Sequence, residues 1–521
     1  MNYSIYTDTD WTYPDSPHNG NQEIALTLPR GGHAGAQILG EIPSSFVQIS
    51  LKWHQETDME ANLFWMIPIG VNENTDSVMM TTTDFERCKT FVTRKAPFEV
   101  YDALLPIEEA PPSGRLALFL CVDAAESVRP GLYTGRVSIR EGKQETVIPL
   151  SCTVSAALVP PLSSSRLGML NFFDYEGLAT QHHVTKNSEK YWEIFGRYVR
   201  AQVDMRCTHI LLPPGETVFE NGELIDFDFS AVEKAGQIAK ANGAIWLCGG
   251  HIAHWHAWDE QEYYPNWSRT LRVTSTEGYL QLRLYLTKWR EIILKNNWQE
   301  CMAQALADEP QTHNDMTYRI LAGIFRKFLP GIPIIDAVET TNLGGGIDIW
   351  VPKQDTYEKW RGEYEKLQSA GETMWFYTCA FPAGPIMNRS MDLPLTASRA
   401  LFWMGAYYRL DGFLHWGFNY YIGSDIWRSA CCPHKGALLP AGDAHIVYPG
   451  KEKPLRSMRY EAQRAGAEDY ELLIQALNTA PSQAEQIIQS VCTDFRNYTR
   501  KGQVLADARN RLFALLTGDA L

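Results

Sequence analysis

The chain has 521 residues, a formal net charge of −14, 45% hydrophobic residues and 21% charged residues. This composition is that of an ordinary folded protein, and the length exceeds what one hydrophobic core organises, so we expect two or three domains. The negative charge argues against nucleic acid or an anionic membrane as the main partner, because both need clustered Lys and Arg. No apolar run approaches the roughly 20 residues of a membrane-spanning helix.

The amino-terminal sequence and the cysteines predict a cytoplasmic protein. MNYSIYTDTDWTYPDSP lacks the basic start and apolar stretch of a secretory signal. The ten cysteines are scattered, and Cys121, Cys248 and Cys379 lie within apolar, strand-like runs. Buried free thiols in a reducing compartment explain this pattern better than disulfides. The sequence does not indicate an oligomeric state.

Residues 1–160 predict a β-sandwich domain. Short segments alternate apolar and polar residues between Pro, Gly and Asn turns, and RPGLYTGRVSIREGKQETVIPLSCTV is typical of consecutive antiparallel strands. A proline-containing linker, LVPPLSSS, follows at 158–165.

Residues 166–450 predict an α/β domain, a (β/α)8 TIM-like barrel. Eight strand candidates alternate with helical patterns over a length that suits this fold: RLGMLNFF, CTHILLPP, AIWLCGG, ECMAQALADEP, IPIIDAV, IDIWVP, TMWFYTC and GFLHWGFNYY. The connection between IPIIDAV and IDIWVP is short, so we expect its helix to be missing or reduced. A doubly wound sheet is disfavoured because no GxGxxG follows an early strand. Residues 451–521 predict a carboxyl-terminal helical extension.

The carboxyl ends of barrel strands form the active site in this fold. They are Asp174, Pro213, His251, Asp308–Glu309, Asp336, Trp350, Tyr377 and Trp416. Only the end of the fourth strand carries two adjacent carboxylates, and Pro310 stops the strand directly after them. Two such groups resist ionising together, so one keeps its proton towards neutral pH, as a proton donor for glycosidic cleavage must. The alternative is that Asp308 or Glu309 caps the following helix.

Aromatic and polar residues near the strand ends favour a carbohydrate ligand, because they offer flat apolar faces with hydrogen-bonding edges. We predict substrate contacts at His251, Trp350, Tyr377, Trp416 and Asn419. Histidines 251, 254 and 256 in HIAHWH also allow a metal site, but no HExxH or matching acid completes it, so we expect neither a metal nor a cofactor.

These segments together resemble glycoside hydrolase family 123, the β-N-acetylgalactosaminidases. The resemblance rests on RPGLYTGRVSI, ADEP, IDIWVP, WFYTC, DLPLTASRALFWMGAYYRLDGFLHWGFNYY and YPGKEKPLRSMRYEAQRAGAEDYELL, and it covers nearly the whole chain. The segment between Pro213 and Trp298 matches no known pattern of the family.

The resemblance implies a retaining, substrate-assisted mechanism through an oxazoline intermediate. Asp308 would orient the substrate's 2-acetamido group, Glu309 would act as proton donor and then as base, and Tyr377 would hydrogen-bond the acetamido carbonyl. The implied substrate is an oligosaccharide or glycoconjugate containing β-linked GalNAc, with exo- and endo-action both open. The alternatives are a glycosidase for another β-linked 2-acetamido or uronic sugar, a non-catalytic carbohydrate-binding barrel, and a metal-dependent hydrolase.

Overall fold

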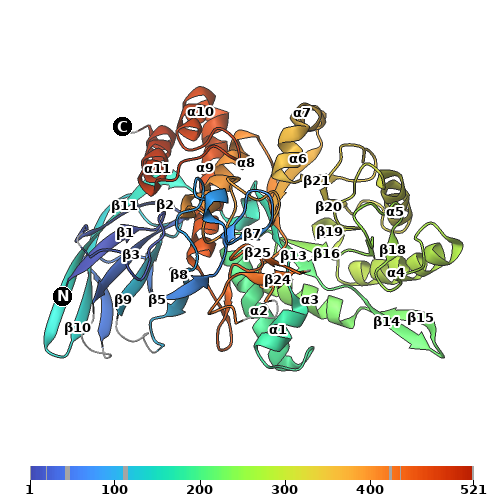
Figure 1. Cartoon of the computed structure of the whole chain (residues 1–521), viewed down its shortest axis with the longest axis horizontal. Coiled ribbons are helices and arrows are strands. Elements are labelled where there is room, and N and C mark those ends of the chain that lie inside the picture. Colours follow the sequence, from blue (N-terminus) through green and yellow to red (C-terminus); the bar gives the residue numbers. More distant parts are fainter. Residues whose placement is uncertain are drawn as a thin grey trace. The chain divides into compact units, whose positions relative to one another are not determined.

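The computed structural model describes residues 2–18, 20–41, 47–109, 115–421, 425–434 and 436–518 (Figure 1). The chain forms two compact units. One comprises Met1–Ser165, Ala380–Arg409 and Asn419–Leu521, and the other comprises Arg166–Cys379 and Leu410–Phe418. The division into domains at 1–160, 166–450 and 451–521 stays a prediction.

Two β-sheets make up the amino-terminal part of the first unit. The five-stranded sheet has the order β1 (Tyr3–Thr7), β3 (His33–Glu41), β9 (Arg115–Asp123), β5 (Glu60–Val71) and β8 (Phe98–Pro106). The four-stranded sheet has the order β2 (Ile24–Arg30), β11 (Gln144–Leu158), β10 (Gly131–Glu141) and β4 (Gln48–Trp53). Ile38 and Leu118 of the first sheet share one core with Val137 and Ile148 of the second, so their apolar faces are packed together.

The predicted antiparallel strands of the sandwich are β10 and β11, which pair from Gly131 opposite Val154 to Glu141 opposite Gln144. Gly142, with a φ of 58°, lies in the turn between them. This left-handed backbone is where glycine is favoured, because a Cβ there would approach the backbone too closely.

The second unit contains the predicted barrel. Its eight-stranded sheet has the order β19 (Met302–Gln304), β16 (Trp246–Gly249), β13 (His209–Leu212), β12 (Gly168–Asn171), β23 (Gly412–His415), β22 (Thr373–Thr378), β21 (Ile349–Pro352) and β20 (Ile335–Val338). Neighbouring strands in this sheet pair in parallel, and a parallel bridge between Gln304 and Ile334 joins its two ends. The TIM-like fold is confirmed.

Helices follow most barrel strands. They are α1 (Tyr175–Gln181), α2 (Glu189–Asp204), α3 (Ser230–Ala241), α4 (Thr276–Lys295), α5 (Asp315–Phe328), α6 (Gln354–Lys359) and α7 (Arg361–Ser369). Residues 339–348, all described, contain no helix, which confirms the reduced connection between the fifth and sixth strands. Two short ribbons extend from this unit: β14 (Glu216–Glu220) with β15 (Glu223–Asp228), and β17 (Ala253–His254) with β18 (Tyr264–Pro265).

The carboxyl-terminal helices belong to the first unit, as does α8 (Leu395–Tyr407), which precedes the last barrel strand in sequence. They are α9 (Met458–Thr479), α10 (Pro481–Gln489) and α11 (Gly502–Thr517). Three short ribbons complete this unit: β6 (Asn74–Thr75) with β7 (Thr81–Thr82), β24 (Cys432–His434) with β25 (Ala437–Leu439), and β26 (Tyr448–Pro449) with β27 (Pro454–Leu455). No helix in the described part of the chain has the length and apolar character to span a bilayer.

A buried ion pair fastens α9 to the sandwich. The Arg459 guanidinium lies 2.8 Å from the Asp102 carboxylate on β8, and neither side chain is exposed. Arg459 also donates to the carbonyl oxygens of Gly442 and His445, and the Tyr448 hydroxyl donates to Asp102. Each charge is therefore compensated, as burial requires.

We predict that Asp102→Asn destabilises the protein by about 3–5 kcal/mol, because it leaves a buried guanidinium without its counter-charge. The urea midpoint, followed by far-ultraviolet circular dichroism, should fall clearly. Glu365→Gln is the control, since it breaks only the exposed Arg361–Glu365 pair on α7, worth about 0.3–0.5 kcal/mol. Equal midpoint shifts in the two variants would contradict the prediction.

Candidate active site

The two adjacent carboxylates lie in a loop beyond the fourth barrel strand. The sequence predicted a strand running up to them, but β19 ends at Gln304, four residues before Asp308. Helix α5 begins at Asp315, and Asn314 occupies its N-cap position. Neither Asp308 nor Glu309 caps this helix, so we discard the capping alternative.

A buried carboxylate on the fifth strand holds this loop. The backbone N–H groups of Leu306 and Ala307 donate to Asp336 Oδ2 at 2.9 and 3.3 Å, and the Tyr318 hydroxyl donates to the same oxygen. Asp336 Oδ1 lies 3.2 Å from Nε2 of His251. Burial raises the pKa of Asp336, whereas His251 and the other donors favour its ionised form. His251 is thereby brought to the loop that carries the pair.

Asp308 and Glu309 have different surroundings. Asp308 is exposed, whereas Glu309 is partly buried and has a φ of 46°. Burial, reinforced by the Asp308 charge, raises the pKa of Glu309 to about 7. A left-handed backbone at a residue other than glycine is strained, and such strain persists where the surrounding structure enforces it.

Tyr377 connects Glu309 to a second carboxylate that the sequence did not single out. Its hydroxyl reaches Glu309 Oε1 and lies 3.0 Å from Glu339 Oε1. Lys353 pairs with Glu339, and the Thr356 hydroxyl donates to it. A phenol carries only one proton, so it cannot donate to two carboxylates at once. A proton on Glu309, donated to the phenol oxygen, lets Tyr377 donate to the Glu339 carboxylate and completes the network.

The structure does not bring every predicted contact residue to this network. Trp350 is buried, donates its indole N–H to Glu372 at 3.1 Å and packs edge-on against Tyr364 of α7. These are the surroundings of a core residue, so we do not keep Trp350 as a substrate contact. Trp416 directly follows β23 and is partly exposed. Asn419 falls in the other compact unit.

The remaining histidines of HIAHWH do not gather with acids. The His254 and His256 rings lie 5.0 Å apart, and Nε2 of His256 is 2.7 Å from the carbonyl oxygen of Arg269. Among the described residues, no group of three or more His, Cys, Asp or Glu side chains is arranged to hold a metal ion.

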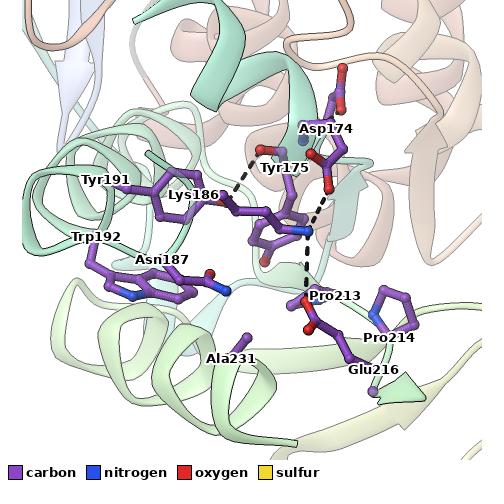
Figure 2. A pocket seen from close by; sticks show the side chains of 12 residues that line it. Asp174, Tyr175, Lys186, Asn187, Tyr191, Trp192, Pro213, Pro214, Glu216 and Ala231 are labelled. Carbon is purple, nitrogen blue, oxygen red and sulfur yellow. Dashed lines mark hydrogen bonds and ion pairs between the residues drawn. The ribbon is translucent and has the colours of Figure 1, made fainter. Parts of the chain in front are cut away.

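A different hollow lies at the ends of the first two barrel strands (Figure 2). Its volume is about 290 Å³, and its lining includes Asp174 and Pro213. Lys186 pairs there with Glu176 and lies 3.8 Å from Glu216. Asp174 accepts hydrogen bonds from the first turn of α1. These contacts describe a salt-bridged structural cluster, and none of the Glu309 network residues lines this hollow.

A closed parallel barrel with paired carboxylates beyond its fourth strand is an arrangement suited to hydrolysing glycosides. The model of the glycoside hydrolase 123 catalytic domain matches residues 173–476, and the chain belongs to this family. It is therefore a glycoside hydrolase. No curated protein matches the sequence.

One solved structure supports the fold over nearly the whole chain. A family 123 glycoside hydrolase from Clostridium perfringens, studied for glycolipid glycan hydrolysis, superimposes with a TM-score of 0.73 at 12% identity and covers 99% of this chain and 98% of its own. A GH10 xylanase from termite gut, with a bacterial Ig-like domain, gives a TM-score of 0.35 at 12% identity, with 86% and 99% coverage. The first likeness extends over both compact units, whereas the second is too weak to carry an argument.

We predict that Glu339→Gln and Lys353→Met move the alkaline limb of the kcat/KM profile in opposite directions. The Glu339 charge raises the pKa of Glu309 and the Lys353 charge lowers it. If Glu309 must be protonated to act, activity is lost as the pH rises through about 7. The limb should therefore move to lower pH in Glu339→Gln and to higher pH in Lys353→Met. Glu365→Gln should leave it in place, and shifts of equal sign in the two network variants would refute the assignment.

Proposed function

We propose that the protein is a retaining β-N-acetylgalactosaminidase that uses the 2-acetamido group of its substrate as the nucleophile. Membership of family 123 supports glycoside hydrolysis. The observation that carries the proposal is the Tyr377 hydroxyl between Glu309 and Glu339. It calls for a proton on one of the two carboxyl groups, and the Lys353 charge beside Glu339 favours Glu309 as the carrier.

In the first step, Glu309 donates its proton to the glycosidic oxygen as the bond to the anomeric carbon breaks. The acetamido carbonyl oxygen attacks the same carbon from the opposite face and closes an oxazoline ring. Asp308 accepts a hydrogen bond from the acetamido N–H and stabilises the positive charge that develops there. With substrate bound, Tyr377 donates to the acetamido carbonyl, which frees the Glu309 proton to face the leaving oxygen.

In the second step, the ionised Glu309 removes a proton from water, which attacks the anomeric carbon and opens the oxazoline. The proton is thereby restored to Glu309, and the acetamido group is regenerated. Two successive inversions leave the product in the β configuration. A pKa of about 7 suits both roles, because the same group is protonated in one step and ionised in the next.

The proposed substrate is an oligosaccharide or glycoconjugate that contains β-linked GalNAc. We keep His251 and Trp416 as proposed substrate contacts, His251 because its ion pair with Asp336 places it beside the loop that carries the acids. Asn419 stays a prediction from the sequence.

We predict that Glu309→Gln lowers kcat by about 10²–10⁴-fold on glycosides with poor leaving groups, the usual worth of a positioned proton donor. The loss should shrink on nitrophenyl glycosides, whose leaving group needs little protonation. Glu365→Gln should retain full activity, and circular dichroism should show that both variants are folded. An equal loss on the two substrate classes would contradict the role of Glu309.

We also predict that activity depends on the acetamido group, because intramolecular attack benefits from effective molarities of about 10⁵–10⁸ M. β-Galactosides without that group should be inert, and a thiazoline analogue of the intermediate should inhibit strongly. Asp308→Asn should weaken both catalysis and thiazoline binding, since an amide supplies no negative charge.

Nuclear magnetic resonance at early times should detect the β product. An inverted product, or efficient hydrolysis of a plain β-galactoside, would overturn the substrate-assisted mechanism. Activity on other 2-acetamido sugars alone would leave the mechanism intact and change only the sugar.

A further inference from the structure

The loop that leaves the third barrel strand carries two tryptophans to the loop that holds the candidate acids. The N–H groups of Ile252 and Ala253 each donate to the Leu306 carbonyl oxygen at 3.0 Å. Asn314 donates to the carbonyl oxygen of Glu260 at 3.2 Å. Residues 252–260 are therefore fixed against residues 306–314 at both ends.

Between these two attachments, Trp255 donates its indole N–H to the main-chain oxygen of Asp308 at 2.8 Å. The rings of Trp255 and Trp258 meet edge to face with centroids 5.4 Å apart. This contact is a favoured geometry between aromatic rings. Trp255 and Trp258, here called the aromatic platform, are thus connected directly to the backbone of the proposed catalytic pair.

Trp258 is 54% exposed, whereas the other fifteen tryptophans, all in the described residues, are buried or only partly exposed. Exposure of one aromatic ring is not unusual by itself, but this ring packs on Trp255, which is hydrogen-bonded to Asp308 of the candidate pair. An aromatic ring in that place offers a ligand a large, rigid apolar face at little cost in conformational entropy. The occupant should combine a flat apolar face with polar edges, because Asp259 and Glu260 follow Trp258 directly. A sugar ring has this character, whereas an anionic membrane would be repelled by the two acids.

We propose that the aromatic platform binds the sugar on the leaving-group side of the cleaved bond, an inference that rests on the function proposed above. Tyr377, in contact with Glu309, belongs to the buried core of the barrel, whereas Trp258 lies in water. A glycan whose terminal sugar lies beside Glu309 extends from there towards solvent. The sugar that contacts Trp258 is then the one on the far side of the cleaved bond. The enzyme then prefers a GalNAc residue attached to a further sugar over a GalNAc glycoside of a small alcohol.

The test compares Trp258→Ala with the parent on two substrates: a β-GalNAc-galactose disaccharide and methyl β-N-acetylgalactosaminide, which has no second ring. The ratio of kcat/KM for the disaccharide to that for the methyl glycoside should fall about 5- to 30-fold, the usual cost of losing an aromatic anchor. Trp258→Phe should recover part of the ratio. The control is Phe219→Ala on the β14–β15 ribbon, which removes an aromatic ring of similar exposure, 57%, and should leave the ratio unchanged.

An unchanged ratio in Trp258→Ala, with a parent active on both substrates, would overturn the platform and leave the proposed function standing. A parent inactive on both substrates would instead refute the proposed function, and the platform with it. A third arm presents the GalNAc disaccharide as a glycolipid in phosphatidylcholine vesicles. A loss confined to vesicles would assign Trp258 to the lipid surface and reject the sugar.

Discussion

The buried carboxylate of Asp336 fixes the segment on which the candidate site depends. Residues 305–310 leave the short strand β19 and lie outside any helix or ladder, so their backbone groups need other partners. Asp336 accepts two of their N–H groups and also pairs with His251, which follows the third strand. One side chain thus sets the geometry of three neighbouring strand ends. A buried carboxylate with several donors is stable only while they remain in place, so these contacts restrain the loop that carries the proposed proton donor.

Restraint of this loop allows two adjacent carboxyl groups to differ in their chemistry. Water solvates the exposed Asp308, whereas Glu309 lies against Tyr377 and loses much of its hydration. On the far side of the phenol, the Glu339 charge raises the pKa of Glu309 and the charge of its partner Lys353 opposes this, so burial and the Asp308 charge dominate. Glu309 therefore keeps its proton nearer to neutral pH, and the burial of one member, more than the closeness of the two, separates their roles.

The sequence predicted the features that depend on local patterns and missed those that depend on distant partners. Strand–helix alternation revealed the barrel, but the fourth strand ends at Gln304 and does not run up to the acids before Pro310 as the sequence predicted. The sequence could not show that Trp350 packs against α7, because parallel strands are apolar on both faces and their pattern does not tell which face points into the barrel. Ile349 and Val351 pack with the barrel interior, whereas Trp350 lies against α7. Glu339 and Lys353 gave no signal, since their pairing joins two strand ends 14 residues apart.

The backbone strain and the burial of Glu309 both cost stability, and this cost supports a functional role for the residue. Glu309 has a left-handed φ and precedes a proline, which further restricts its allowed backbone. Burial disfavours its charged form at neutral pH. Both effects oppose folding. A glycine at this position would relieve the backbone strain, and a glutamine would remove the buried charge. A chain selected for stability alone would have no reason to keep a glutamate there, because stabilising changes at such positions are easily reached. The raised pKa is instead what a proton donor beside a glycosidic bond requires, so the residue that costs stability in this loop is the one that the proposed reaction uses.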